Sequence, residues 1–334
     1  MRTTPDLFDR FGVIDVDTHL TEPADLWTSR VPSAWHDQVP HIERVDGKDV
    51  WMAGGTKLST PGIVSIAGWP ECIPSHPPTF DDIDPAAYDA HARVAFMDEQ
   101  GIAAQVIYPN VGGFGAQYFR SLGDNNVVVG CVQAYNDFLT DWTSVAPARL
   151  VAVTATPFWD LEFSLREIDR CLAMGHRAIN FCNRPDAHGM PPLGSRHWDP
   201  IWARAQEAGV PISFHIGGGS MTGGLSQIRA DEKGFHAAFS SYSSLLILDN
   251  QRCLADLIFG CFWFERASAL WAIEQYPDNI LYETDFPHPT CQHPNAYAPS
   301  RYPRDYATDV LSSLSDAHLA KVLHDNAASL YGLA

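Results

Sequence analysis

The chain has 334 residues, of which 46% are hydrophobic and 19% charged, enough for one large domain or two ordinary ones. Acidic residues outnumber basic ones, 40 to 22, and the formal net charge of −18 argues against nucleic acid or anionic membranes as partners. Residues 1–11 lack the apolar run of a signal peptide, and no segment approaches the roughly 20 apolar residues of a membrane span. We therefore expect a cytoplasmic protein.

The seven cysteines form no C-x-x-C pair. An odd number of cysteines in a reducing compartment indicates free thiols, most of them in the core. Zinc bound by cysteine is therefore not expected.

The first predicted strand, residues 13–19, ends in an aspartate and a histidine. Strand residues two positions apart point the same way, so Asp17 and His19 should project together from the carboxyl end of the strand. This geometry suits two ligands of one metal ion.

Residues 21–78 differ from the rest of the chain in their scattered Pro, Gly and Trp, and we interpret them as an inserted subdomain beside the site. They contain a predicted hairpin, residues 41–45 and 49–52, that turns at Asp46-Gly47. Two interpretations of the tryptophans stay open: they form pocket walls, or they pack a small subdomain. The residues concerned are Trp27, Trp51 and Trp69.

From residue 81 onward the hydrophobic pattern alternates between helix and strand. Predicted helices are 81–100, 130–145, 161–174, 199–208, 237–259, 267–276 and 315–330. Predicted strands are 103–109, 150–156, 178–181, 210–216, 261–265 and 280–285. With residues 13–19 these strands favour a closed (β/α) barrel over an open sheet, in one domain spanning residues 1–334.

In such a barrel the active site lies at the carboxyl ends of the strands. Asp17, His19, His215 and Asp285 all fall at such ends. Taken singly, each has a structural interpretation, such as a turn cap for Asp17 or a hydrogen-bonded strand histidine for His215. Together they can surround one divalent cation, and imidazole and carboxylate ligands do not choose among Zn²⁺, Mn²⁺ and Fe²⁺. Such an ion lowers the pKa of a bound water, whose proton Asp285 could accept.

Motifs along nearly the whole chain resemble the amidohydrolase-related family typified by aminocarboxymuconate semialdehyde decarboxylase, whose members are metal-dependent (β/α)8 barrels. The motifs are Ile14-Asp15-Val16-Asp17-Thr18-His19, Met97-Asp98-Glu99-Gln100-Gly101, Ala134-Tyr135-Asn136-Asp137, Ala148-Arg149-Leu150, Pro192-Leu193, His197-Trp198-Asp199-Pro200-Ile201-Trp202, Phe214-His215, Thr284-Asp285-Phe286-Pro287-His288 and His324-Asp325-Asn326-Ala327-Ala328-Ser329-Leu330-Tyr331-Gly332.

The resemblance implies a ligand set. The family's first-strand H-x-H falls on Asp17 and His19, its fifth-strand histidine on His215 and its last-strand aspartate on Asp285. Asp17 departs from the family's histidine, and its negative charge should favour a harder ion such as Mn²⁺. Residues 178–181 lack the lysine that bridges two metals in dinuclear relatives, so one metal is expected.

A second departure follows Gly260, where relatives continue through a sixth strand and a long helical segment. Here Cys261 begins what resembles the seventh strand, so about fifty residues of the family pattern are missing. We interpret this gap as an omitted segment. An intact mass equal to the 36.9 kDa of these residues would contradict that interpretation.

Other candidates are individual residues near the strand ends. His288 could orient a ligand or contact substrate, or simply bond to the backbone. Arg184 is the best-placed cation for a substrate carboxylate, although loop arginines are commonly solvated. Glu22 could support the ligands from behind. Residues 217–219 resemble a phosphate loop only superficially, because no G-K-[ST] follows them.

Three functions remain open from the sequence. The first is hydrolysis of a small carbonyl-bearing substrate with Asp285 as base and His288 beside it. The second, permitted by the resemblance, is non-oxidative decarboxylation of an aromatic or unsaturated acid. The third is a non-catalytic metal-binding barrel. The scarcity of cations near the strand ends favours hydrolysis over decarboxylation. The partner is a small molecule in the first two cases, and the resemblance allows a homodimer.

Overall fold

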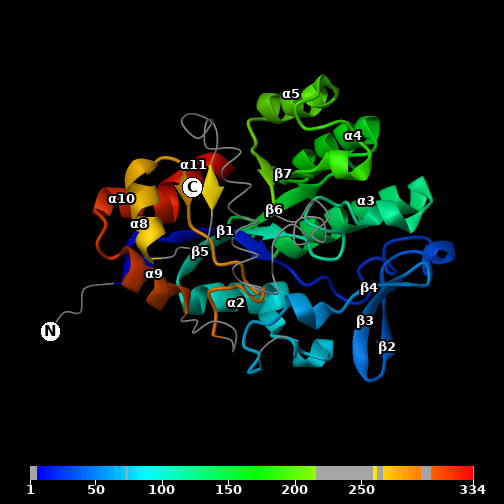
Figure 1. Ribbon diagram of the computed structural model, residues 1–334, viewed down its shortest axis with the longest axis horizontal. Coiled ribbons are helices and arrows are strands. Elements are labelled where there is room, and N and C mark those ends of the chain that lie inside the picture. The colour runs from blue at the N-terminus through cyan, green and yellow to red at the C-terminus, as the bar shows by residue number, and fades with distance from the viewer. Residues whose placement is uncertain (1–5, 72–73, 216–258, 262–265, 295–301, 334) are drawn as a thin grey trace, which may run out of the picture.

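The computed structural model describes residues 6–71, 74–215, 259–261, 266–294 and 302–333. Its centre is a curled sheet in which each strand runs parallel to the next (Figure 1). In sheet order the strands are β1 (Val13–His19), β5 (Ile102–Tyr108), β6 (Leu150–Ala155), β7 (Ala178–Phe181) and β8 (Ile212–Phe214). Order in the sheet follows order in the chain, as right-handed βαβ crossovers around a barrel require.

The last part of the chain joins the other side of β1. Strands β9 (Gly260–Cys261) and β10 (Ile280–Leu281) pair in parallel. The segment after β10 then runs beside β1, where the Val16 amide donates to the Tyr282 carbonyl at 3.0 Å and Thr18 forms a parallel bridge with Phe286. The described strands therefore follow one another around a barrel, and the predicted (β/α) barrel class is confirmed.

Helices cover the outside of this sheet (Figure 1). The α-helices are α1 (Leu7–Phe11), α2 (Ala90–Gln100), α3 (Asn125–Thr143), α4 (Leu161–Ala173), α5 (Asp199–Ala208), α8 (Arg266–Gln275), α9 (Pro303–Leu311), α10 (Asp316–Ala320) and α11 (Asn326–Tyr331). A π-helical turn, Lys321–Asp325, joins α10 to α11. Short 3-10 turns occupy Ser33–Trp35, Pro61–Val64, Phe80–Asp82, Pro85–Ala87, Phe119–Leu122, Pro185–His188 and Arg196–Trp198. None of the described helices is both long and apolar enough for a bilayer span.

Several element boundaries differ from the sequence prediction. The helix expected from residue 81 begins only at Ala90, because Pro85 starts a separate 3-10 turn and the Asp89 carboxylate accepts the Ala92 amide as an N-cap. The helix expected from residue 130 begins at Asn125, where Asp124 caps it. Residues 237–258 of the helix expected at 237–259 lie outside the described residues, as do residues 262–265 of an expected strand.

The predicted hairpin is present and gains a third strand. β2 (His41–Val45) and β3 (Lys48–Ala53) pair antiparallel, and β4 (Thr56–Ser59) adds to β3. Asp46 and Gly47 both have positive φ, 49° and 77°, as a tight two-residue turn of this kind requires. In Figure 1 this small sheet stands to one side of the barrel, at the right of the view.

The interpretation of a missing sixth strand concerns the stretch between β8 and β9. No hydrogen-bonded pairing links these two strands among the residues that the structure describes. Residues 216–258, which lie between them, fall outside the described ranges. The omitted segment therefore stays a prediction, and intact mass remains its test.

Side chains alternate between two environments along the barrel strands. Ile14, Val106, Val153 and Ala178 form an apolar cluster inside the barrel. The alternate residues, such as Ile179 in β7, pack against the surrounding helices. Polar side chains at the carboxyl ends of the inner face complete the barrel mouth, and the candidate site is built there.

Candidate functional site

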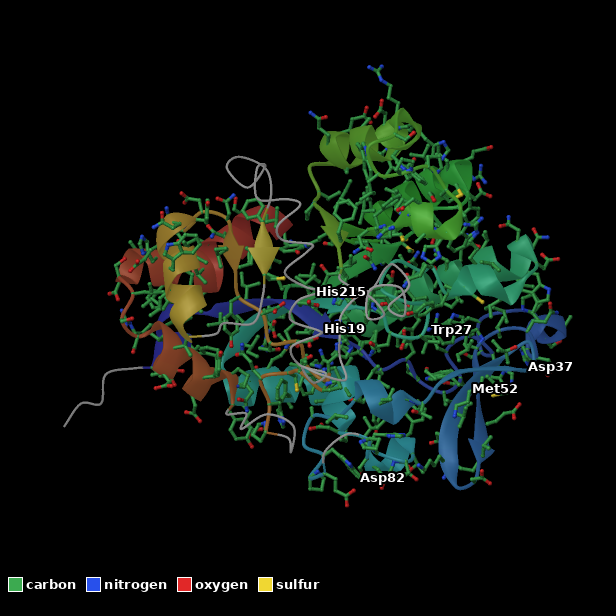
Figure 2. The ribbon with its side chains drawn as sticks, viewed as in Figure 1. His19, Trp27, Asp37, Met52, Asp82 and His215 are labelled. Carbon is green, nitrogen blue, oxygen red and sulfur yellow. The ribbon has the colours of Figure 1, made fainter. Side chains whose placement is uncertain are left out.

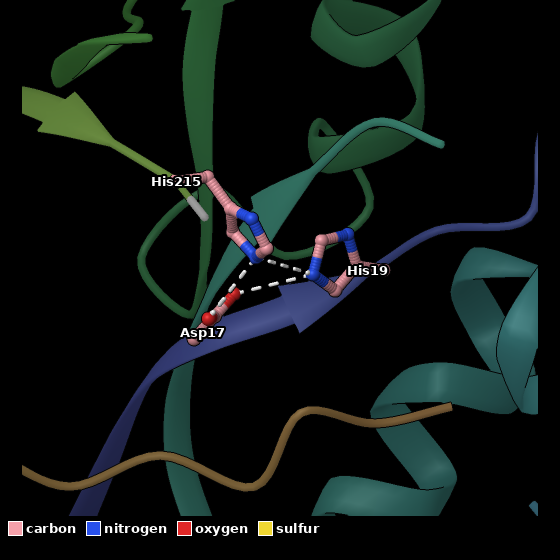
Figure 3. Close-up of side chains that lie close together, drawn as sticks. All are labelled: Asp17, His19 and His215. Carbon is pink, nitrogen blue, oxygen red and sulfur yellow. Dashed lines mark hydrogen bonds and ion pairs between the residues drawn. The ribbon is translucent and has the colours of Figure 1, made fainter. Parts of the chain in front are cut away.

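Asp17, His19 and His215 meet at the carboxyl end of the barrel (Figure 3). Asp17 and His19 both belong to β1, and His215 directly follows β8. The two imidazole Nε2 atoms are 3.2 Å apart. The Asp17 carboxylate lies 3.3 Å from each of them, through Oδ1 to His19 and through Oδ2 to His215. The sequence prediction thus places these three donors correctly in one cluster.

The His19 ring is held in one orientation. Its Nδ1 lies 3.1 Å from the Pro109 carbonyl oxygen, which can only accept a hydrogen bond. The hydrogen of the neutral ring therefore resides on Nδ1. The Nε2 lone pair is left facing Asp17 and His215, as metal ligation by histidine requires.

Burial and neighbouring charges set the protonation states of Asp17 and His19. Burial, with the nearby His288 imidazole, lowers the pKa of His19 to about 4, so the ring is neutral at pH 7. Burial opposes ionisation of Asp17, but attraction to His215 and His19 outweighs it and holds the pKa of Asp17 below its ordinary value. An Asp17 carboxylate beside a neutral His19 imidazole results.

The donor set fits a divalent cation. Asp17 Oδ1 is a buried oxygen with no hydrogen-bond partner among the described residues. Two facing Nε2 atoms at 3.2 Å and an unbonded carboxylate oxygen are costly when buried alone. One hard or borderline ion would satisfy all three groups at once.

Asp285 lies in a second cluster that shares His19 with the first. Its ligand atom groups with those of His19 and His288, and its Oδ1 is 3.7 Å from His19 Nε2. The residue takes a left-handed backbone conformation, φ 56°, which is uncommon for a residue other than glycine. Its amide donates to the Asp17 carbonyl at 2.9 Å. The backbone thus holds Asp285 next to the first cluster.

His288 connects Asp285 to Asn110. His288 Nδ1 is 2.7 Å from Asp285 Oδ1, and His288 Nε2 is 2.8 Å from Asn110 Oδ1. The Asn110 amide is oriented by its own bond, Nδ2 to the Leu20 carbonyl, so its oxygen faces the histidine. Nε2 therefore carries a hydrogen. The short contact of Nδ1 with Asp285 then needs one further proton, shared by the imidazole and the carboxyl group.

Glu22 supports this arrangement from behind, as the sequence suggested. Its Oε1 accepts the amides of Asn110 and Val111 at 2.8 and 3.0 Å, fixing the turn that carries Asn110. Burial raises the pKa of Glu22 to about 7. Glu22 acts on the site through Asn110 and His288 and is a positioning residue.

A buried polar network ties β1 to the segment that carries Asp285. Asp15 accepts both the amide and the hydroxyl of Thr284, at 2.9 and 2.6 Å, and the Gln105 side chain at 3.1 Å. Arg93 donates to Gln105 Oε1 at 3.2 Å and to the His19 carbonyl at 2.7 Å. All of these side chains are buried. The network holds His19 and Asp285 in register.

An aromatic ring packs over the imidazoles. Phe114, from the loop after β5, lies with its ring centroid 4.1 Å from that of His215 and 5.0 Å from that of His19. The His19 and His288 rings stack at 3.8 Å. Apolar surface close to the ligand atoms excludes water and strengthens electrostatic interactions there.

A third group with metal-ligand spacing, Asp17, Cys261 and Glu283, was not anticipated from the sequence. Burial and the charges of Asp17 and Asp285 raise the pKa of Glu283 well above its ordinary value. Burial likewise raises the pKa of the Cys261 thiol. The thiol is therefore neutral at pH 7 and the charged form of Glu283 is disfavoured, so this group is a poorer candidate for a cation than the imidazole cluster.

Two sequence candidates have other partners in the structure. Trp27 is 0% exposed, donates its indole N–H to the Cys131 carbonyl and packs edge-on against Trp51 and Phe119. Figure 2 shows it to the side of His19 and His215. Trp27 is thus a core residue, and its interpretation as a pocket wall is wrong. Arg184 forms an ion pair with Asp186 and is 55% exposed, so a substrate role for it stays a prediction.

Sequence reasoning missed several residues that support the ligands. Asn110 and Thr290, which donates to Asp285, lie on loops without a periodic pattern. Asp15 carried a signal: a carboxylate between the apolar Ile14 and Val16 is costly unless it is paired. Its partners, Gln105 and Thr284, could not be read from local pattern because they are far away in the chain.

The comparisons of this chain with known proteins agree on one family. The sequence profile described as amidohydrolase matches residues 14–251 and 252–333. A gamma-resorcylate decarboxylase of Polaromonas sp. (strain JS666 / ATCC BAA-500) is 27% identical over 128 residues, 37% of each chain. A 2-keto-4-carboxy-3-hexenedioate hydratase of Sphingobium sp. (strain NBRC 103272 / SYK-6) is 26% identical over 160 residues, 46% of this chain and 44% of the relative. The chain thus matches less than half the length of these curated relatives.

Solved structures share the fold over nearly the whole chain. An amidohydrolase from Mycobacterium avium subsp. paratuberculosis K-10 superposes with a TM-score of 0.67 at 20% identity, covering 96% of this chain and 99% of that one. A dihydroxybenzoic acid decarboxylase from Polaromonas sp. JS666, solved with manganese and the inhibitor 2-nitroresorcinol, gives 0.56 at 17% identity and covers 97% of both chains.

Proposed function

The chain belongs to the amidohydrolase family, and on that premise we propose that it is a one-metal enzyme that decarboxylates a small aromatic or unsaturated carboxylic acid without an oxidant. The observation that carries the proposal is the convergence of Asp17, His19 and His215, with the Asp285–His288 pair beside them. A divalent ion bound there would hold the substrate carboxylate and a neighbouring oxygen and draw electron density from them.

The Asp285–His288 pair supplies the proton that this reaction needs. When the carbon–carbon bond to the carboxyl group breaks, carbon dioxide leaves and the electron pair stays on the substrate carbon. That carbon must then gain one proton. The contact between Asp285 and His288 contains a proton, oriented by Asn110, that can be donated at this step.

The relatives support decarboxylation over the hydrolysis favoured by the sequence alone. Both curated relatives, a decarboxylase and a hydratase, act on small carboxylic acids by their names, and a decarboxylase shares the fold. Manganese in that decarboxylase also supports a hard divalent ion here, in line with the carboxylate ligand Asp17.

Hydrolysis remains a second candidate because the same pair has the groups for it. Asp285 could accept a proton from an attacking water, and His288 could return it to the leaving group. The substrate would then be a small ester or amide. The partner in either case is a small molecule.

The test is an activity panel on protein reconstituted with manganese or zinc. We expect carbon dioxide release from one or more of 2,6-dihydroxybenzoate, other hydroxybenzoates and unsaturated dicarboxylic acids, and its loss in His215→Ala. Hydrolysis of esters or amides without carbon dioxide release would favour the second candidate. Metal-loaded protein that is inert on every substrate would contradict both and favour a non-catalytic barrel.

A further inference from the structure

Asn180, the third residue of β7, faces the inside of the barrel. Ala178 belongs to the interior cluster with Val106 and Val153, whereas Ile179 and Phe181 pack with the outer helices. Because side chains alternate along a strand, Asn180 shares the inner face with Ala178 and lies closer to the carboxyl end.

The Asn180 side chain is fully buried, yet neither its amide nitrogen nor its amide oxygen has a hydrogen-bond partner within the described part of the chain. A buried amide is normally hydrogen-bonded through both its nitrogen and its oxygen, and leaving these atoms without partners costs roughly 1–3 kcal/mol. The side chain thus presents two unused donors and one unused acceptor to the barrel interior.

Asn180 lies on the strand next to the one that leads into His215. It pairs in register with Ser213 of β8, two residues before His215. From the other side, the loop after β5 reaches the end of β7: a Cβ on Gly115 would lie 2.7 Å from the Cys182 Cα. The preceding residue, Phe114, packs on His215. The side chains of His19 and Asn180 are both fully buried, so both lie in enclosed parts of the barrel.

We propose that Asn180 binds an oxygen substituent of the substrate, a carboxylate or a hydroxyl group, next to the metal site. The inference rests on the proposed function, because it takes the substrate to be an oxygen-bearing acid held near His19 and His215. It also explains how a substrate carboxylate can be bound where few cations lie at the strand ends. A neutral amide can donate to a carboxylate and can both donate to and accept from a hydroxyl group.

The experiment compares Asn180→Leu with a matched control, Asn136→Leu. Asn136 is also a fully buried asparagine, but its amide is satisfied: Nδ2 donates to the Ala155 carbonyl at 3.0 Å, and Oδ1 accepts the Ala155 amide at 2.9 Å. Leucine has nearly the same shape and no polar atoms. We expect Asn136→Leu to lower the melting temperature by several degrees and Asn180→Leu to leave it unchanged or raise it.

Ligand binding is then measured by calorimetry on manganese-loaded wild type and Asn180→Leu, with 2,6-dihydroxybenzoate, benzoate and resorcinol as probes. The variant should keep the wild-type metal content and bind an oxygen-bearing probe about 10- to 100-fold more weakly. A loss confined to benzoate would identify a carboxylate contact, and one confined to resorcinol a hydroxyl contact; each supports the proposal.

Three results would overturn it: a melting temperature that falls as far in Asn180→Leu as in Asn136→Leu, an unchanged affinity for every probe, or metal-loaded wild type that binds none of them. Probe binding that depends on Asn180 but is not followed by turnover would count against the proposed reaction and still support the contact.

Discussion

Arg93 is a fully buried cation whose donors are directed at the backbone and at Gln105. It donates to the carbonyls of Ala86 and His19 and to Gln105 Oε1. The Gln105 Nε2 in turn donates to Asp15. Its guanidinium also lies over the Phe286 ring, 4.7 Å from the centroid. One side chain thus contacts both segments that carry candidate metal ligands.

Replacing Arg93 by Met should lower the free energy of unfolding by about 3 kcal/mol, because buried carbonyl and amide groups lose their partner. Urea denaturation measures this loss. The control is Arg166→Met, which removes an exposed pair with Glu162 and should change stability by less than about 0.5 kcal/mol. Equal stability of the two variants would contradict a structural role for the network.

His176 is a buried histidine far from the proposed chemistry. Its ring nitrogens lie 3.0 Å from the Thr154 hydroxyl and 2.9 Å from the Thr140 hydroxyl. Burial favours the neutral ring and lowers the pKa of His176 from 6.5 to about 4, against a partial opposing effect of the nearby Glu167. Folding therefore prefers the neutral imidazole, and its contribution to stability is complete above pH 6.5 and is lost as the pH falls toward 4.

The wild-type protein should accordingly lose about 2 kcal/mol more stability between pH 7 and pH 4.5 than His176→Gln does. Urea denaturation of both proteins at the two pH values measures the difference. His91→Gln, at an exposed position on α2, is the control and should follow the wild type. The same pH dependence in His176→Gln and wild type would show that this histidine does not carry the effect.

The loop after β5 packs against the backbone that follows β7 and also contacts the site through Phe114. Gly115 sits against the Cys182 backbone, and a methyl group there would approach the Cys182 Cα to 2.7 Å. Gly115→Ala should push the loop outward, move Phe114 off His215 and weaken probe binding about 10-fold or more, with a loss of roughly 1–3 kcal/mol in stability. Calorimetry and urea denaturation measure the two effects.

Gly194→Ala is the matched control for this prediction. No atom lies within 4 Å of a Cβ built on Gly194, which is not among the positive-φ glycines. It should bind probe and unfold as the wild type does. If Gly115→Ala also binds probe and unfolds as the wild type does, the close packing of this loop is not required for probe binding.

Element types could be predicted from the sequence better than their limits. The apolar runs that became β1, β5, β6 and β7 are buried on both faces, so their pattern is strong and their bounds were nearly correct. The start of α2 was wrong by nine residues, 90 against 81, because helical periodicity in residues 81–89 is real but Pro85 and the Asp89 cap divide it. Helix α9 was missed, although its buried residues Pro303, Ala307, Val310 and Leu311 recur at helical spacing.

The barrel could be predicted because strands and helices alternate and because strand ends gather at one face. This placed Asp17, His19 and His215 together and brought Asp285 beside them. Local pattern could not supply the partners that orient these groups. Asn110, Arg93 and Gln105 contact the site through tertiary folding alone. The sequence leaves two interpretations of Trp27 open because an aromatic residue in an irregular segment has no periodicity to show its burial.

We propose that Asp17, His19, His215 and Asp285 together hold one divalent ion. Metal analysis of purified, manganese-reconstituted wild type, His215→Ala and Asp285→Asn tests it directly, with His91→Gln as the control. We predict about one ion per chain in wild type and control, and less than about a tenth of that in both variants, because each loses a ligand atom. Undiminished metal in both variants would contradict the assignment of the site.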